Sequence, residues 1–246
     1  MNKTPIKAVT FDFWRTLFYS GINAKERRIA RAQFLADTLT IPLDQAKEAM
    51  KHQERSFLRI HVEEQRTLLP LDAIPFIESA LDCAIPTETA QVLADHFSQI
   101  ILSHPPDPVD GALDAVKAAA QLVPVGVISD TGISPGAPLT RLLEKHGFMD
   151  HLTSLTFSDD IGVAKPQAAM YYHAAKGLGV DHTELLHIGD LEPTDITGAL
   201  NIGARAALFG GDNDKFVGNT RAHYTFTHWN DFVDALPQIL KDESSQ

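Results

Sequence analysis

The stretch IKAVTFDFWRTL, residues 6–17, decides the fold. Residues 6–12 are short, apolar and partly β-branched, which predicts a strand buried inside a sheet. The strand ends at Asp12, so that the Asp12 carboxylate would stand at the edge of the sheet. A lone aspartate after a strand is more often a turn or capping residue. Any chemical role for Asp12 therefore depends on what else reaches the same edge.

Five further segments share this buried-strand pattern, namely 123–129, 152–158, 184–190, 204–210 and 223–228. Helix-like segments lie between them, one of which begins near Asp110. Strands that alternate with helices favour an α/β fold, a doubly wound parallel sheet with helices on both faces. Right-handed crossovers bring the carboxyl ends of such strands to one edge, where ligands of these sheets bind.

Residues 20–104 differ from the rest, because they contain no convincing strand. They are predicted to form four helices, at 23–39, 43–65, 71–82 and 87–103. In the last helix an apolar stripe is expected to be core, formed by Val92, Leu93, Phe97, Ile100 and Ile101. We therefore expect two domains, an α/β core of residues 1–19 and 105–246 and an inserted helical domain of residues 20–104.

Five polar side chains occur in a fixed order along the predicted sheet. Asp12, Ser129 and Asp190 each end a predicted strand, Lys165 lies in IGVAKP, and Asp195 lies in GDLEPTD. Singly, each is better explained as a cap, a loop hydroxyl or a surface charge. Jointly they supply a carboxylate to attack phosphorus, a hydroxyl and an ammonium to hold phosphate oxygens, and carboxylates to hold a divalent cation. This inventory suits phosphoryl transfer through an aspartyl intermediate.

The same segments resemble the four motifs of the haloacid dehalogenase superfamily. FDFWRTL resembles the first motif, ISDTG the second, VAKP the third and GDLEPTD the fourth. The resemblance covers nearly the whole chain, and the helical insert is similar to the small helical cap of that family. It implies a Rossmannoid core whose cap closes over the site.

The resemblance also implies roles for the candidate residues. Asp12 would be the nucleophile, while Ser129 and Lys165 would bind the transferring phosphoryl group. Asp130 and Arg15 are further candidates for substrate binding.

The implied cofactor is Mg²⁺. Its ligands would be Asp12, Asp190 and the main-chain carbonyl of Trp14, and Asp195 would orient Lys165 or a metal-bound water. Magnesium prefers hard oxygen ligands, which this set provides.

The chain departs from the family pattern beside the nucleophile. Phosphatases of the family carry a second Asp two positions after it, where this chain has Trp14, and Arg15 occupies a position that is usually Gly. An indole donates one hydrogen bond but cannot shuttle protons. Transfer to Asp12 could survive for good leaving groups, whereas release should be slowed by about 10²–10⁴-fold. A surrogate acid or base could come from the stretch HVEEQR, with His61, Glu63, Glu64 and Arg66, although a solvated helix end explains this stretch better.

Two other functions stay open. Trp14 and Arg15 could mark a protein that binds a phosphorylated ligand without turning it over, or very slowly. An aromatic residue at position 14 also suits a 2-haloacid dehalogenase, whose family members carry Tyr there. Those enzymes carry Ser-Asn at the start of the fourth motif, however, whereas this chain keeps Gly189-Asp190. A magnesium-dependent phosphatase that acts on a small phosphorylated metabolite is therefore the favoured prediction.

Composition and net charge argue against several other classes of protein. The 246 residues carry a formal net charge of -11, which argues against broad nucleic-acid binding. No apolar run approaches the ~20 residues of a membrane-spanning helix. Cys83, the single cysteine, cannot form an internal disulfide, and the N-terminus lacks a signal-peptide pattern, so a cytoplasmic protein is expected. The substrate and the oligomeric state are not predicted.

Overall fold

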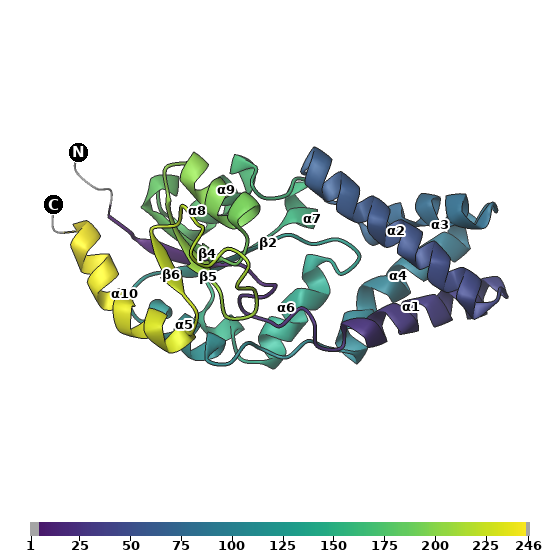
Figure 1. The fold of residues 1–246 in the computed structure, drawn as a ribbon, viewed down its shortest axis with the longest axis horizontal. Helices are drawn as coiled ribbons and strands as arrows, with labels where there is room; N and C mark the ends of the chain where they lie inside the picture. Colours follow the sequence, from purple (N-terminus) through teal and green to yellow (C-terminus); the bar gives the residue numbers. More distant parts are fainter. Residues whose placement is uncertain (1–4, 245–246) are drawn as a thin grey trace.

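The computed structural model describes residues 5–244, which form a six-stranded sheet and a separate group of helices (Figure 1). All strand pairs are parallel, in the order β3-β2-β1-β4-β5-β6. The strands are β1 (Ala8–Phe11), β2 (Val125–Ser129), β3 (Ser154–Phe157), β4 (Leu185–Gly189), β5 (Arg205–Phe209) and β6 (Tyr224–Phe226). Each lies within a predicted strand segment, and the predicted parallel α/β fold is confirmed. Because β1 lies between β2 and β4, the residues that follow these three strands are neighbours at one edge.

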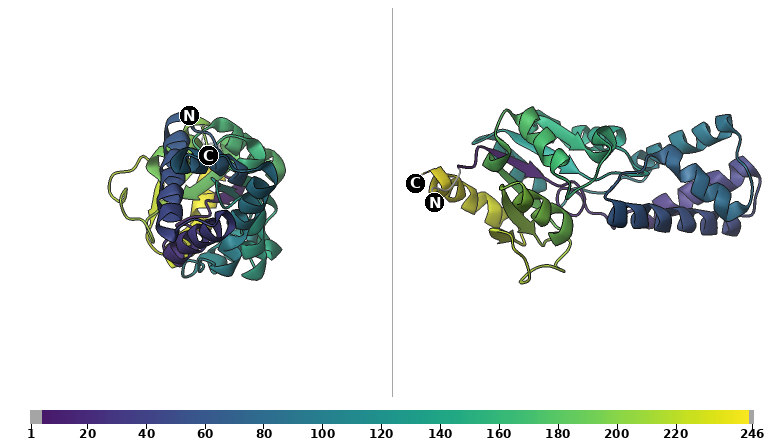
Figure 2. Two further views of the ribbon diagram at one scale, coloured as in Figure 1. Left: turned by 90° about the vertical axis from the view of Figure 1, so that its right-hand side faces the viewer. Right: turned by 90° about the horizontal axis from the view of Figure 1, so that it is seen from above.

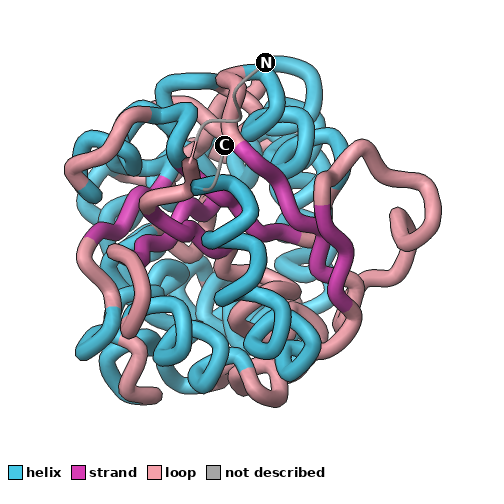
Figure 3. The backbone as a smooth tube through the Cα atoms, turned by 90° about the vertical axis from the view of Figure 1, so that its left-hand side faces the viewer, coloured by secondary structure: helices cyan, strands magenta, loops and turns pink. Residues whose placement is uncertain are grey.

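Helices cover both faces of the sheet. One face carries α5 (Ala112–Ala120), α6 (Gly136–Lys145) and α10 (Trp229–Ser244), and the other carries α8 (Ala168–Leu178) and α9 (Thr197–Asn201). Short connecting helices are α7 (Ser158–Ile161), η2 (Met149–His151), η3 (His182–Glu184) and the π-turn η4 (Glu192–Ile196). Figure 3 shows the strands between these layers, seen from the end of the sheet away from the remaining helices.

The alternation of side chains along β1 builds the two layers. Val9 and Phe11 belong to the core under α5 and α10, whereas Ala8 belongs to the core under α8. Phe11 contacts Trp229 edge to face, with ring centroids 5.5 Å apart, and Trp229 stacks on Phe209 at 4.1 Å. These aromatic contacts fix α10 against the centre of the sheet.

The remaining helices form a bundle that extends from the edge of the sheet (Figures 1 and 2). This bundle consists of α1 (Ala24–Leu39), α2 (Leu43–Glu64), the 3₁₀ turn η1 (Pro70–Asp72), α3 (Ala73–Leu81) and α4 (Thr87–Ser103). It has its own hydrophobic cluster, which includes the fully buried Leu35, Ile77 and Phe97. The four helices lie at the predicted positions, except that the third begins with the 3₁₀ turn.

The expectation for the apolar stripe of α4 is wrong at one residue. Leu93, Phe97 and Ile101 are fully buried and Ile100 nearly so, but Val92 is 53% exposed. One residue step turns a helix by about 100°, so that Val92 lies away from the face that Leu93 presents. The buried face is therefore narrower than the run of apolar residues.

Two linkers connect the bundle to the sheet, residues 12–23 before α1 and residues 104–111 after α4. The buried Arg27 donates hydrogen bonds to the carbonyls of Ser20, Ile22 and His104, and so bridges both linkers. At the far end of α2, the carbonyl of Gln65 accepts a hydrogen bond from the Ala164 amide at 3.0 Å. The bundle thus contacts the α/β part both at the linkers and at the end of α2.

Within residues 5–244, no helix combines the length and the apolar character that crossing a lipid bilayer would require.

Truncation of Phe97 to Ala should destabilise the bundle, because this side chain is fully buried. The expected loss in the free energy of unfolding is about 3–5 kcal/mol, measured by urea denaturation. Val92→Ala, on the exposed side of the same helix, is the matched control and should change stability little. Equal losses for both variants would contradict this assignment of the core.

Candidate active site

A buried lysine joins the candidate residues from three parts of the chain. Lys165 Nζ donates hydrogen bonds to Asp12 Oδ1 and Asp195 Oδ1, each at 2.6 Å, and to the carbonyl of Ile128 at 3.2 Å. Only 3% of Lys165 is exposed, and Asp12 and Asp195 are also buried, at 5% and 0%. Attraction to Asp12 and Asp195 outweighs the opposing effect of burial, so the pKa of Lys165 is well above its usual value. The ammonium therefore stays charged.

Besides Lys165, two further groups hold the Asp195 carboxylate. Its Oδ1 lies 3.1 Å from His187 Nε2, and its Oδ2 accepts from the Leu191 amide at 3.0 Å. His187 is buried within β4, and its Nδ1 lies 3.0 Å from Thr10 Oγ1 on β1. Burial lowers the pKa of His187, against the opposing effect of Asp195. A neutral imidazole thus connects two strands to the carboxylate that orients Lys165.

Gly189 makes room for this arrangement. A Cβ at position 189 would lie 2.2 Å from Cγ of Asp195, much closer than two carbon atoms that are not bonded to each other can approach. Glycine at the end of β4 is therefore required by the close approach of the Asp195 side chain.

Three carboxylates gather at the edge of the sheet. Asp12, Asp190 and Asp195 are buried, and one ligand oxygen from each lies within 4.8 Å of the others. Burial and the nearby Asp195 and Asp190 carboxylates raise the pKa of Asp12 well above its usual value, although Lys165 opposes this. Burial and repulsion from Asp195 raise the pKa of Asp190 to about 7. One lysine does not balance three buried carboxylates, and a divalent cation among these oxygens would offset the excess negative charge.

The oxygens differ in how much they are already used. Both oxygens of Asp195 accept hydrogen bonds, whereas the bond described for Asp12 uses only Oδ1. Asp190 Oδ2 accepts from Asn213 Nδ2 at 2.6 Å. Asp12 and Asp190 therefore suit direct ligation of a cation, while Asp195 suits the positioning of Lys165. The Trp14 carbonyl, two residues after Asp12, remains a predicted third ligand.

The second motif lies beside Lys165. Ser129 is fully buried at the end of β2, and its Oγ donates to the carbonyl of Asp130 at 3.2 Å. Asp130 Oδ1 accepts from the main-chain amide of Lys165 at 2.9 Å. Burial raises the pKa of Asp130, against the attraction of Lys165. Asp130 thus fixes the backbone that carries Lys165.

The turn after Asp12 is strained at Arg15. Its φ of 58° lies in the left-handed region, which glycine adopts freely and other residues adopt at a cost of about 1–2 kcal/mol. The exposed side chain donates from Nε to Ser20 Oγ at 2.9 Å. Its positive charge also lowers the pKa of Asp190 slightly, against the larger effect of burial. Arg15 therefore lies near the carboxylates, and its contact with a substrate remains a prediction.

At the C-terminal end of α2, Glu63 and Glu64 face solvent, whereas His61 faces the candidate active site. Glu63 pairs with Arg59 at 3.4 Å and Glu64 with Arg66 at 3.3 Å, all on the exposed surface. His61 instead points toward the sheet, where its Nε2 lies 3.5 Å from Asp130 Oδ2. One residue of the HVEEQR stretch thus reaches the second motif.

Two polar groups that the sequence did not single out are Asn213, which contacts the site, and Thr16, which is buried in the segment after Asp12. Asn213 lies on the long loop of residues 210–223 that projects from the sheet (Figure 3), and it contacts Asp190. Thr16, four residues after Asp12, has a buried Oγ1 without a hydrogen-bond partner among the described residues. The strand-end rule, applied to the strand at 204–210, would have directed attention to the loop of Asn213. The hydroxyl of Thr16 gave no sequence signal.

Substitution of Gly189 by Ala should displace Asp195 and disrupt its contact with Lys165. We expect the free energy of unfolding to fall by about 1–3 kcal/mol, the usual cost of overpacking. Urea denaturation checks this against Gly21→Ala, where an added methyl would meet nothing within 4 Å. Equal stability of the two variants would show that the close approach at position 189 is not limiting.

The fold is shared with solved structures. A 2-haloacid dehalogenase from Pseudomonas syringae pv. Tomato DC3000 superposes with a TM-score of 0.71 at 22% sequence identity. The match covers 96% of this chain and 99% of that one. At this identity the likeness establishes the fold alone.

Two curated proteins of Escherichia coli are similar in sequence. Pyrimidine 5'-nucleotidase YjjG is 32% identical over 97 residues, 39% of this chain and 42% of that protein. The phosphatase YigB, which acts on 5-amino-6-(5-phospho-D-ribitylamino)uracil, is 29% identical over 104 residues, 42% of this chain and 40% of that protein. The aligned region thus spans about two fifths of the length of these relatives.

A broader match comes from the family description. The model of a hydrolase family described as haloacid dehalogenase-like hydrolase matches residues 6–203 of the chain. This range contains β1, β2 and β4 and all five of the residues Asp12, Ser129, Lys165, Asp190 and Asp195. The chain belongs to the haloacid dehalogenase-like hydrolases.

Proposed function

We propose that the protein is a magnesium-dependent phosphatase that hydrolyses a small phosphorylated metabolite through phospho-Asp12. The observation that carries this proposal is the buried Lys165, whose Nζ lies 2.6 Å from both Asp12 and Asp195. The similarity to a nucleotidase and to a phosphatase supports the same class of substrate. Phosphoryl transfer has use for a fixed ammonium beside an ionised nucleophile, because the transferring group is anionic.

The first step follows from the position of Asp12. Lys165 orients the Asp12 carboxylate through Oδ1, so that Oδ1 attacks phosphorus while Oδ2 stays available as a ligand for the cation. A bond forms between Oδ1 and phosphorus while the bond from phosphorus to the leaving oxygen breaks. Lys165 and Ser129 hold the equatorial oxygens. Mg²⁺ bound by Asp12, Asp190 and the Trp14 carbonyl would supply charge neutralisation between the carboxylate and the phosphate.

The helical bundle is proposed to serve as the cap of residues 20–104 over the core of residues 1–19 and 105–246. Support comes from the separate hydrophobic cluster of the bundle and from its contacts beside the second and third motifs, at His61 and at Gln65. A cap in this place limits the access of water and selects the leaving group.

Trp14 sets the limit on the second step. Its half-buried ring packs edge to face on Phe13, with centroids 5.0 Å apart, in the position where the family carries an acid–base Asp. Water attack on phospho-Asp12 then lacks its usual base. His61, which lies 3.5 Å from Asp130, is the residue of α2 that we propose as a partial substitute.

Asp12→Asn should abolish Mg²⁺-dependent hydrolysis of p-nitrophenyl phosphate, because an amide oxygen is a far weaker nucleophile than a carboxylate. Circular dichroism should show an unchanged fold. A chelator should abolish turnover by the wild-type protein. Undiminished turnover by the variant would defeat the proposal, and halide release from a 2-haloacid in the presence of the chelator would establish dehalogenation instead.

Trp14→Asp should restore the missing acid–base group and raise the steady-state rate by about 10²-fold or more. The wild type should show a burst of p-nitrophenol followed by a slow phase, measured by stopped flow. Trp14→Phe is the matched control and should keep the slow phase, whereas His61→Gln should slow it further.

The same experiment separates the alternatives. A wild-type steady-state rate equal to that of Trp14→Asp would show that the indole does not limit release. Activity seen in the Asp variant alone would mark the natural protein as a binder of phosphorylated ligands.

A further inference from the structure

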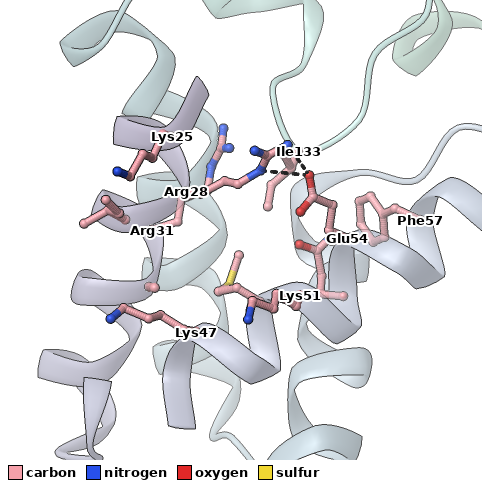
Figure 4. A pocket seen from close by; sticks show the side chains of 12 residues that line it. Lys25, Arg28, Arg31, Lys47, Lys51, Glu54, Phe57 and Ile133 are labelled. Atoms are coloured by element: carbon pink, nitrogen blue, oxygen red, sulfur yellow. Dashed lines mark hydrogen bonds and ion pairs between the residues drawn. The ribbon is translucent and has the colours of Figure 1, made fainter. Parts of the chain in front are cut away.

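A pocket lies in the helical bundle, and none of Asp12, Asp190 and Asp195 lines it. It has a volume of about 270 Å³ between α1 and α2, and Ile133 of the loop after β2 closes one side (Figure 4). The apolar lining consists of Ile29, Ala32, Met50, Phe57 and Ile133. None of the other motif residues lines the pocket.

Arg31 brings a buried positive charge to this pocket. The side chain is 7% exposed, and it donates from Nε to the carbonyl of Phe97 at 3.1 Å and from Nη2 to Ser134 Oγ at 2.9 Å. Among residues 5–244, no carboxylate lies within ion-pair distance of Arg31, and no hydrogen bond is described for its Nη1. Burial lowers the pKa of Arg31 to about 10, which leaves the group charged at neutral pH. Glu54 attracts Arg31 from a distance without forming an ion pair with it, so the buried guanidinium still favours an anion beside it.

The rim of the pocket is also basic. Lys25, Arg28, Lys47 and Lys51 surround the opening, and Glu54 is the one acidic residue of the lining. Figure 4 shows these side chains on the two facing helices, with Glu54 paired to Arg28. Glu54 Oε1 accepts from Arg28 Nε at 3.1 Å and from Nη2 at 3.0 Å, so that the charges of Glu54 and Arg28 offset one another and Arg31, Lys25, Lys47 and Lys51 supply the positive charge of the pocket.

The surroundings make this basic surface selective. Lys47 and Lys51 each pair with an acid of the preceding turn, Asp44 and Glu48, at exposed positions where such pairs are weak. The whole chain carries a net charge of -11, so that a basic pocket is a local exception to the acidic surface. An anion would be attracted to this pocket and repelled by most of the remaining surface.

We propose that this pocket binds a small amphipathic anion, with an apolar body that fits a volume of about 270 Å³ and a carboxylate or phosphate headgroup that pairs with Arg31. The apolar lining accommodates the body, and the rim lysines add attraction for the headgroup. The site is separate from the phosphoryl-transfer site. It is nevertheless close to the junction with the core, because Phe57 also lines a smaller cavity with His61 and Thr131.

The test uses three ligands with the same ten-carbon tail. Decanoate, decyl phosphate and decyltrimethylammonium are titrated by calorimetry, below their micelle concentrations, into the 246-residue Asp12→Asn protein, which should not hydrolyse decyl phosphate. Saturating inorganic phosphate with Mg²⁺ is present throughout, so that the reaction site is occupied. Both anions should bind with one site per chain, and the cation should bind at least about tenfold more weakly because its headgroup is repelled. Tighter binding of decanoate assigns the headgroup as a carboxylate, and tighter binding of decyl phosphate assigns it as a phosphate. Equal affinities for the cation and the anions would overturn the proposal.

Ile29→Glu tests the location. Ile29 lines the pocket but is 44% exposed, so that the substitution should not unfold the protein. It should weaken decanoate binding by about tenfold or more, because it puts a carboxylate into the apolar lining and adds negative charge to a pocket that binds an anion. Val92→Glu adds the same charge at an exposed position of α4 outside the pocket and should leave binding unchanged. Equal weakening by both variants would exclude this pocket.

A competition experiment tests separateness from the reaction site. Decanoate should bind Asp12→Asn as tightly as it binds the wild type, and saturating inorganic phosphate with Mg²⁺ should not displace it. Displacement by phosphate would show that both ligands occupy one site, and the proposal of a separate pocket would then be wrong. Loss of phosphatase activity in an independent assay would not alter this result.

Discussion

The ion pairs of Lys165 are the interaction on which the functional end of the molecule depends. A fully buried ammonium is unfavourable alone, and so are the buried carboxylates beside it. Together they compensate one another, because Lys165 reaches Asp12 and Asp195 at the same distance of 2.6 Å. The loop after β1, the segment before α8 and the turn after β4 are thereby held at one point. Because these charged groups are buried away from water, removal of any one of them leaves the others without compensation and should destabilise the fold.

The packing around this point serves the same end. Gly189 leaves space for Asp195, His187 spans from β4 to Thr10 of β1, and Asp130 holds the backbone of Lys165. These contacts are made by residues that take no direct part in the proposed chemistry. They reduce the number of positions that the charged groups can adopt, which is what preorganisation means in structural terms.

The sequence predicted the sheet well because its central strands β1, β2 and β4 are short, fully buried and mostly apolar runs between clear helical segments. Asp12 and Asp190 could be placed together because each follows a strand and parallel strands end at one edge. The contact of Asn213 with Asp190 could not be predicted, since it depends on the path of the loop 210–223. The exposure of Val92 likewise depends on which helices pack against α4, and not on its own apolar character. Local pattern thus determined the elements, whereas contacts between distant loops required the structure.

The connection between bundle and sheet has a consequence for how the chain can vary. Arg27 grips both linkers through their peptide oxygens, those of Ser20, Ile22 and His104, at 2.9–3.1 Å. Every amino acid has a main-chain carbonyl oxygen, so these hydrogen bonds do not depend on the side chains of Ser20, Ile22 and His104. We therefore expect substitutions at Ser20, Ile22 and His104 that keep the backbone path to preserve these contacts, while the loss of the Arg27 guanidinium would loosen both linkers at once.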